Sequence, residues 1–288
     1  MLNFYLNTKL ALDKKLNLQP KDYEDSILMA MGLPYLEANA FDLFNPFAIK
    51  YFRKVKKNDW KEGEYEIFLS KMDNYYNSFS NRNPFILFFS LKDDWSIIGK
   101  KSAISTLNWL KFEGHRSFFH QVFVWRKELI TRNFDVIKDF LQECLENEIN
   151  IPYFEAYEMN FDEQQLKNSS FYKELEYNLM FSEQYENQMP DCGILAWDMC
   201  RFINLVRNCK STRYITTKEA WEFIRSVKEM CFSNFNSWQE FTLSFKLGRK
   251  YWLRGTYSSF NVESFCDELL KDNLKSWNHF HWEKKPLM

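Results

Sequence analysis

Glycine and proline are scarce in this chain, and the alternation of apolar and polar residues that favours strands is almost absent. Only seven Gly and seven Pro occur among 288 residues. The stretches between them carry apolar residues at helical spacing, which favours helices joined by short polar loops. We therefore predict an all-α fold, an irregular multi-helix globular bundle with short loops.

Long apolar runs are also missing. The longest, such as residues 85–89, extend over only a few positions, whereas a membrane-spanning helix needs about 20 apolar residues. The first fifteen residues lack the charged start and unbroken apolar stretch of a signal peptide. We expect a cytoplasmic protein with no membrane partner.

Neither sign of charge is in excess, since 38 Lys and Arg stand against 39 Asp and Glu. No global field therefore attracts nucleic acid. The two short basic clusters, at 50–57 and 246–254, are typical of a solvated or packed helix face. The sequence does not favour nucleic-acid binding.

The familiar catalytic and metal-binding motifs are missing as well. The six cysteines form no Cys-x-x-Cys pair, and we interpret them as reduced core residues. Of the four histidines, only His279 and His281 are spaced like ligands, and no Cys or carboxylate stands near them at zinc spacing. There is no Gly-x-Ser-x-Gly elbow and no glycine-rich phosphate loop. We expect no metal and no cofactor.

Aromatic residues, in contrast, are abundant. They make up 19% of the chain, and ten of them are Trp. Trp and Tyr dominate ordinary cores through their large buried area, and they are also enriched in protein-binding hot spots. The excess fits either a bulky core or an adhesive surface.

The helical pattern extends over most of the chain. We predict helices near residues 22–32, 43–57, 63–79, 96–113, 117–147, 162–187, 192–209, 217–234, 238–253 and 262–277. We expect one helical domain over 1–288, in which 1–90 can form an N-terminal lobe and 95–253 forms the core.

The stretch 194–206 is apolar nearly all round, which predicts a central helix buried on most sides. Asp198 and Arg201 interrupt it and stand three residues apart, hence on one face. Because burying either charge alone costs roughly 3–5 kcal/mol, we expect the two to be paired.

Two later helices begin with capping boxes, Thr216 to Glu219 and Ser237 to Glu240. Gly248 lies inside the apolar stripe of the second helix, where glycine costs about 1 kcal/mol relative to alanine. We expect it to allow another helix to approach closely, with Arg249 beside it as a second buried cation.

Several strings carry a family resemblance. They are Trp95-Ser96-Ile97, Leu107, Trp109-Leu110, Gly114-His115-Arg116, Trp197-Asp198-x-x-Arg201, Tyr214-Ile215, Glu219-Ala220-Trp221, Ser237-Trp238-x-Glu240-Phe241 and Gly248-Arg249-x-x-Trp252. Over about 95–253 the chain resembles the bacterial domain of unknown function DUF1266. The resemblance implies a helical fold and a cytoplasmic setting, but no activity. In many relatives a Gly precedes the Tyr-Ile pair, whereas Arg213 does so here, and this puts the turn geometry in question.

One hypothesis for function is an enzyme. Asp198, Arg201, Glu219, Arg249 and His115 could converge on one pocket and act as acid and base of a hydrolase or transferase, with the arginines holding a small anionic substrate. The alternative is structural, because capping explains Glu219 and an Asp–Arg pair on a buried helix fixes packing. We favour the structural interpretation.

The other hypothesis, which we prefer, is a non-catalytic protein-binding protein, specifically an immunity protein that neutralises a bacterial competition toxin. It is based on analogy with other aromatic-rich helical proteins that lack catalytic motifs. The predicted partner-binding residues lie in one acidic, aromatic stretch, for which an ordinary loop is the alternative. They are Tyr153, Glu155, Tyr157, Glu158 and Asp162. The sequence leaves the oligomeric state open.

Overall fold

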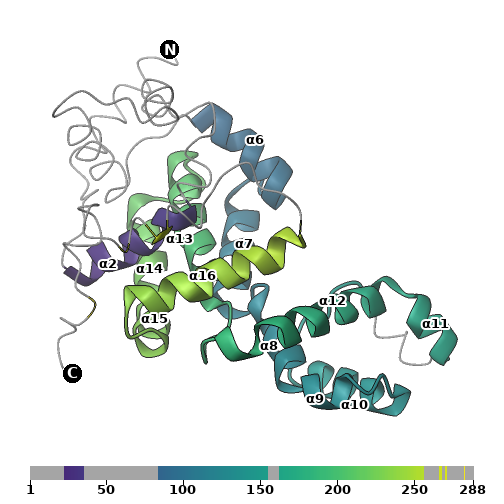
Figure 1. Ribbon diagram of the computed structural model, residues 1–288. Helices are drawn as coiled ribbons and strands as arrows, with labels where there is room; N and C mark the ends of the chain where they lie inside the picture. The colour runs from purple at the N-terminus through teal and green to yellow at the C-terminus, as the bar shows by residue number, and fades with distance from the viewer. Residues whose placement is uncertain are drawn as a thin grey trace, which may run out of the picture.

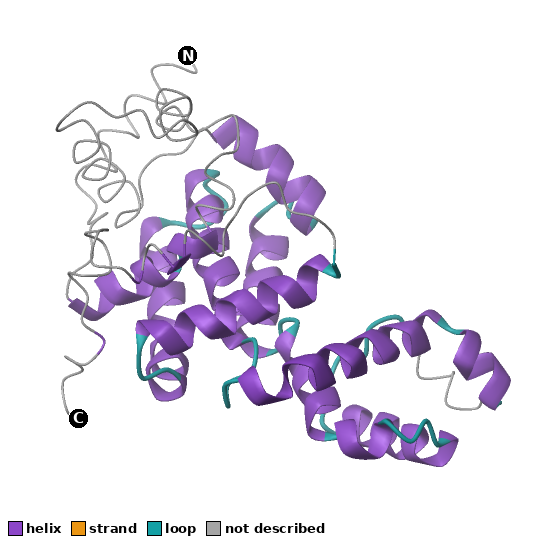
Figure 2. Cartoon of the chain, viewed as in Figure 1, coloured by secondary structure: helices purple, strands orange, loops and turns teal. Residues whose placement is uncertain are grey.

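Every regular element in the part of the chain that the structure describes is a helix (Figure 2). The structure, a computed structural model, describes residues 23–35, 84–154 and 162–255 and the single positions 266, 267, 270 and 282. The elements are α2 (Tyr23–Met31), α6 (Pro84–Trp95), α7 (Lys100–Phe112), α8 (Arg116–Val124), α9 (Arg126–Leu129), α10 (Phe134–Glu146), α11 (Glu163–Asn168), α12 (Ser170–Tyr185), η2 (Glu186–Gln188), α13 (Leu195–Ser211), α14 (Thr217–Ser226), α15 (Lys228–Asn234) and α16 (Trp238–Leu253). The predicted all-α class is confirmed.

The helices form a body and an arm (Figure 1). The body contains α2, α6, α7 and α13 to α16, which share one large apolar core. The arm, residues 116–188, contains α8 to α12 and extends to one side with a core of its own. A smaller cluster joins the two cores and consists of Phe119, Phe181, Ile194, Leu247 and Tyr251.

Helix α13 is the axis of the body. Every residue of α13 except Asn208 and Ser211 is buried. The helix packs against α2, α6, α7, α14 and α16, so it contacts neighbours on most sides. This confirms the central helix predicted from the apolar stretch 194–206.

Helix α16 crosses α13 at close range. A Cβ atom added at Gly248 would lie 2.3 Å from the Cβ of Trp197. No side chain fits in that space, so the close approach predicted for Gly248 is confirmed.

The predicted capping boxes are formed in full at α14 and in part at α16. The Thr216 hydroxyl accepts a hydrogen bond from the Glu219 backbone N–H, and the Glu219 carboxylate accepts one from Thr216 N–H at 2.8 Å. At α16 the Ser237 hydroxyl accepts from Glu240 N–H at 3.1 Å. The Glu240 carboxylate, however, accepts from Asn236 N–H, one residue before the expected donor.

Some helix boundaries differ from the prediction. The stretch 117–147 forms three helices instead of one, and the Asn133 side chain caps the last of them by accepting from Asp135 and Val136 N–H. The stretch 162–187 divides at Ser169, whose hydroxyl caps α12. Side-chain caps at Asn133 and Ser169 thus begin new helices inside stretches whose apolar spacing predicts one continuous helix.

Other differences concern helix α6 and the stretches that the structure does not describe. Helix α6, over 84–95, was not predicted, because its run of apolar residues shows no helical periodicity. The predicted helices at 43–57 and 63–79, and nearly all of 262–277, lie outside the described residues. No helix in the described ranges is both long and apolar enough to cross a membrane.

The end of α13 shows why a glycine would suit the position of Arg213. Arg213 has φ +67°, and its N–H donates to the Lys210 carbonyl at 3.0 Å. The next N–H, of Tyr214, donates to the Cys209 carbonyl at 2.9 Å. These two bonds form a Schellman motif, whose left-handed residue is usually Gly. The helix therefore ends in the usual geometry with a residue that is strained in it.

Replacing Arg213 with glycine should stabilise the protein. A left-handed backbone costs a residue with a Cβ atom roughly 1–2 kcal/mol, whereas Gly loses about 0.5–1 kcal/mol of unfolded-chain entropy. We expect Arg213→Gly to raise the free energy of unfolding in urea by about 0.5–1 kcal/mol. Arg213→Ala is the control, because it removes the side chain but keeps the Cβ atom; an equal gain in both variants would contradict the backbone explanation.

Candidate functional site

A buried charge with several bonded partners, Asp198, lies near the start of α13. Its side chain is fully buried. Oδ1 is ion-paired with Nη2 of Arg201, one turn further along the same helix. Oδ2 lies 3.1 Å from Nη1 of Arg116 and also accepts a hydrogen bond from the Arg116 backbone N–H at 3.1 Å. The pairing of Asp198 with Arg201 is thus confirmed, and Arg116 is a second partner.

Arg116 connects Asp198 to the end of α7. Its Nη1 donates to the Leu110 carbonyl at 2.7 Å, and its Nη2 donates to the Lys111 carbonyl. A cation at this position satisfies carbonyls that a helix end leaves free and stabilises the negative end of the helix dipole. One guanidinium therefore holds α7 and α13 together.

Gly114 makes this arrangement possible. It follows α7 with φ +62°, and a Cβ atom there would lie 2.0 Å from Oδ2 of Asp198. Both the backbone angle and the space require glycine. The Asp198 carboxylate can therefore approach the backbone of the α7–α8 turn directly.

Arg201 is enclosed by aromatic rings. Its Cζ lies 4.9 Å from the ring centre of Trp197 and 5.7 Å from that of Trp95, within the range of a cation–π interaction. Its Nη2 lies 2.8 Å from Nδ1 of His115. Since two guanidinium groups face a single carboxylate, we infer that the aromatic faces and the neutral imidazole accommodate the surplus positive charge.

His115 is kept neutral by its surroundings. Burial, and next the positive charge of Arg201, lower its pKa to about 4, although Asp198 acts in the opposite direction. A neutral ring can accept the Arg201 hydrogen bond at Nδ1, which places the ring proton on Nε2. The imidazole therefore completes the buried network as an acceptor.

The network is poorly suited to acid–base chemistry. Its carboxylate has no solvent access and already accepts three hydrogen bonds from two arginines. A substrate therefore cannot reach the carboxylate without breaking these contacts. The network instead acts as a buried set of ionic contacts that holds α7, α8 and α13 together.

Two residues grouped with Asp198 from the sequence are not its partners. Glu219 forms an ion pair with Lys100, the first residue of α7. Asp198 instead bonds to Arg116, which follows the turn at the other end of α7. At about 1.5 Å per residue, thirteen residues of helix separate these points by about 20 Å. Arg249 is buried on α16, but the ion pairs of Asp198 are formed by Arg116 and Arg201.

Glu219 is nevertheless electrostatically perturbed. The hydrogen bond from Lys100, and next that from the Thr216 backbone, lower its pKa to about 2. Both partners favour the charged carboxylate, as its role in the cap requires. Its role in the capping box at the start of α14 accounts for the presence of Glu219 at this position.

The predicted partner-binding stretch is only partly described. Tyr153 lies in the turn after α10 and is 67% exposed. Asp162 is the N-cap of α11, where its carboxylate accepts a hydrogen bond from Gln165 N–H at 2.8 Å. Glu155, Tyr157 and Glu158 lie outside the described residues.

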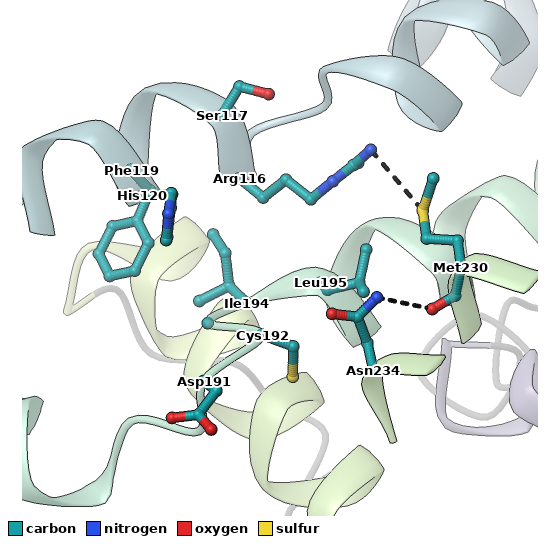
Figure 3. Close-up of a pocket in the computed structure, with 11 residues that line it drawn as sticks. Arg116, Ser117, Phe119, His120, Asp191, Cys192, Ile194, Leu195, Met230 and Asn234 are labelled. Carbon is teal, nitrogen blue, oxygen red and sulfur yellow. Dashed lines mark hydrogen bonds between the residues drawn. The ribbon is translucent and has the colours of Figure 1, made fainter. Parts of the chain in front are cut away.

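Sequence reasoning missed a pocket of about 320 Å³ between the arm and the body (Figure 3). Its polar residues include His120, Asp191 and Asn234, from three segments with no shared motif, so no sequence pattern indicated them. Arg116 also lines it, and the Gly-His-Arg triplet was an available signal for that residue. Among the described residues, no group of three or more His, Cys, Asp or Glu side chains could hold a metal ion.

Removing the Asp198 charge should strongly destabilise the fold. Asp198→Asn leaves two buried guanidinium groups without a carboxylate, so we expect the free energy of unfolding to fall by about 3–5 kcal/mol. Glu219→Gln makes the same chemical change at a partly exposed ion pair and should cost less than about 1 kcal/mol. Similar losses in urea titrations of the two variants would show that Asp198 is not the central tie.

The depressed pKa of His115 predicts a pH dependence of stability. Between its ordinary pKa of 6.5 and the folded value of about 4, the unfolded chain binds a proton at His115 and the folded chain does not. Stability should therefore fall as the pH drops through this window, by up to about 3 kcal/mol from this residue. Urea titrations at several pH values should show a smaller fall for His115→Gln. The control His120→Gln, at an exposed ring, should keep the wild-type slope.

Comparison with known protein families finds a match over the residues that form this network. A family model described as "Protein of unknown function (DUF1266)" matches residues 90–282, which is more than half of the chain. No curated protein and no solved structure matches. The matched range includes the α7–α8 turn and the whole of α13 to α16, and hence all four members of the Asp198 network. The chain belongs to the DUF1266 family.

Proposed function

We propose that the protein is a non-catalytic protein-binding protein, and specifically a cytoplasmic immunity protein that neutralises a toxin from competing bacteria. The observation that carries the non-catalytic part is the burial of Asp198 between Arg116 and Arg201. The most conspicuous charged cluster of the family-like motifs is used to hold helices together, and its carboxylate has no solvent access through which a substrate could reach it.

The positions of the other polar residues support the same proposal. Glu219, the second carboxylate of the enzyme hypothesis, lies at the far end of α7 and caps α14. An acid and a base that bond to opposite ends of a helix about 20 Å long are poorly placed to act on the same bond. Asp198 and Glu219 are therefore poorly placed to act as the acid and base that the enzyme hypothesis requires.

The arm supplies surface features that suit a protein partner. Residues 116–190 contain fourteen Asp and Glu but only seven Lys and Arg, although the whole chain is nearly neutral. An acidic surplus confined to one part of a protein accelerates and orients the binding of a basic partner. Toxins that act on nucleic acid are commonly basic for the same electrostatic reason.

Tyr153 is the described residue of the arm best suited to anchor such a partner. Its ring is largely in solvent, and its backbone has φ +60°, which is uncommon for an aromatic residue. Tyrosine is also among the residues that contribute most binding energy at interfaces. We therefore include Tyr153 in the partner-binding surface, beside the acidic residues predicted from the sequence.

The proposal is tested by co-expressing the protein with toxic products of neighbouring genes in its native host. We expect the wild-type protein to restore growth, and Tyr153→Asn to lose this protection, because Asn tolerates the left-handed backbone but lacks the ring. The matched control is Phe112→Gln, since Phe112 is equally exposed, at 65%, but lies on α7 of the body. Loss of protection by both variants, or by neither, would remove Tyr153 from the surface, and absence of any neutralised toxin would contradict the proposed function.

A further inference from the structure

The pocket between the arm and the body has the size of a small-molecule site. Its volume of about 320 Å³ is at the lower end of the range of about 300–1,000 Å³ typical of ligand pockets. One wall comes from α8 of the arm, and the others come from the turn before α13 and from α15 (Figure 3). Pockets at such junctions between packing units are frequent ligand sites.

Apolar side chains form much of the lining. Phe119, Ile194, Leu195 and Met230 all contribute to it. Met is flexible and polarisable, so it adapts to the shape of a ligand. This part of the pocket suits a short aliphatic or thioether group.

The α8 wall is positively charged. Arg116 supplies this charge: its side chain is 14% exposed, and it shares the carboxylate of Asp198 with Arg201. Its described contacts use Nη1 and Nη2, which leaves Nε–H without an acceptor among the described residues. His120, one turn along α8, is exposed and forms no hydrogen bond within the described chain. This wall can receive an anionic group.

Asp191 supplies the opposite charge from the turn before α13. Its carboxylate is exposed and forms no ion pair or hydrogen bond with the described residues. In Figure 3 it lies across the pocket from Arg116 and His120. Asn234, whose amide nitrogen is engaged by the Met230 carbonyl at 2.8 Å, adds its side-chain oxygen as a second acceptor. This side of the pocket can receive a cationic donor.

We propose that this pocket binds a free α-amino acid with an apolar side chain. Its carboxylate faces Arg116 and His120, its ammonium group faces Asp191, and its side chain lies on the apolar lining. A ligand with one charge alone satisfies only one wall and leaves the other charge unpaired and partly desolvated. None of the predicted partner-binding residues is among those that line this pocket, and the proposal does not depend on the proposed immunity function.

The cysteine in the pocket does not point to a covalent reaction. Burial raises the pKa of the Cys192 thiol to about 11, so the sulfur is protonated at neutral pH and is a poor nucleophile. The pocket therefore holds its ligand by reversible ionic and apolar contacts, and we infer no chemical step.

Isothermal titration with three probes tests the proposal. L-leucine carries both charges, 3-methylbutylamine lacks the carboxylate, and 4-methylpentanoate lacks the ammonium group. We expect leucine to bind at millimolar concentrations or better, and each truncated probe to bind at least roughly tenfold more weakly, since a charge-assisted hydrogen bond contributes about 1.5–3 kcal/mol. Absence of leucine binding, or equal binding of either truncated probe, would overturn the proposal.

A pair of Asp→Asn variants locates the binding. Asp191→Asn should weaken leucine binding at least roughly tenfold without weakening the binding of 4-methylpentanoate, which has no ammonium group to lose. Asp139→Asn, at an exposed carboxylate on α10 outside the pocket, should bind leucine like the wild-type protein. Urea titrations check that both variants fold. Unchanged leucine affinity in Asp191→Asn would place any binding elsewhere and overturn the site.

Discussion

A single buried carboxylate, Asp198, organises the centre of this protein. It bonds to Arg201 on its own helix and to Arg116 across the α7–α8 turn. An isolated ion in this position would be costly, whereas an ion that accepts three hydrogen bonds from two cations specifies one arrangement of its neighbours. Because Arg116 also bonds to the last carbonyls of α7, the end of α7, the start of α8 and the start of α13 are held in one register.

The Asp198 network requires a glycine at one position, Gly114. Among the described residues, φ is positive at six non-glycine positions but at only three glycines. The strained positions end several helices, and Arg213 at the end of α13 is one of them. Gly114 is different, because a Cβ atom would overlap the carboxylate of Asp198. In a chain with few glycines, one is thus placed where sterics permit no other residue.

The arm begins at this network, with the first residue of α8. Helix α8 starts with Arg116, which bonds to Asp198 and lines the pocket beside the body. The exposed Tyr153 lies in the turn after α10 of the same arm. The arm thus carries Tyr153, which we assign to partner binding, and the pocket that we assign to a small ligand lies where the arm meets the body.

The sequence by itself determined the helical class, the central helix, the pairing of Asp198 with Arg201, the cap at Thr216 and the close approach at Gly248. These features follow from periodicity, from helical spacing and from the cost of burying a charge or placing glycine in a helix, all of which are local. Only the tertiary structure decided that Arg116 joins Asp198 while Glu219 pairs at the opposite end of α7, and that His120, Asp191 and Asn234 line one pocket. Contacts between distant segments depend on how the helices cross. The apolar pattern of one helix does not predict which residues of another helix it will meet.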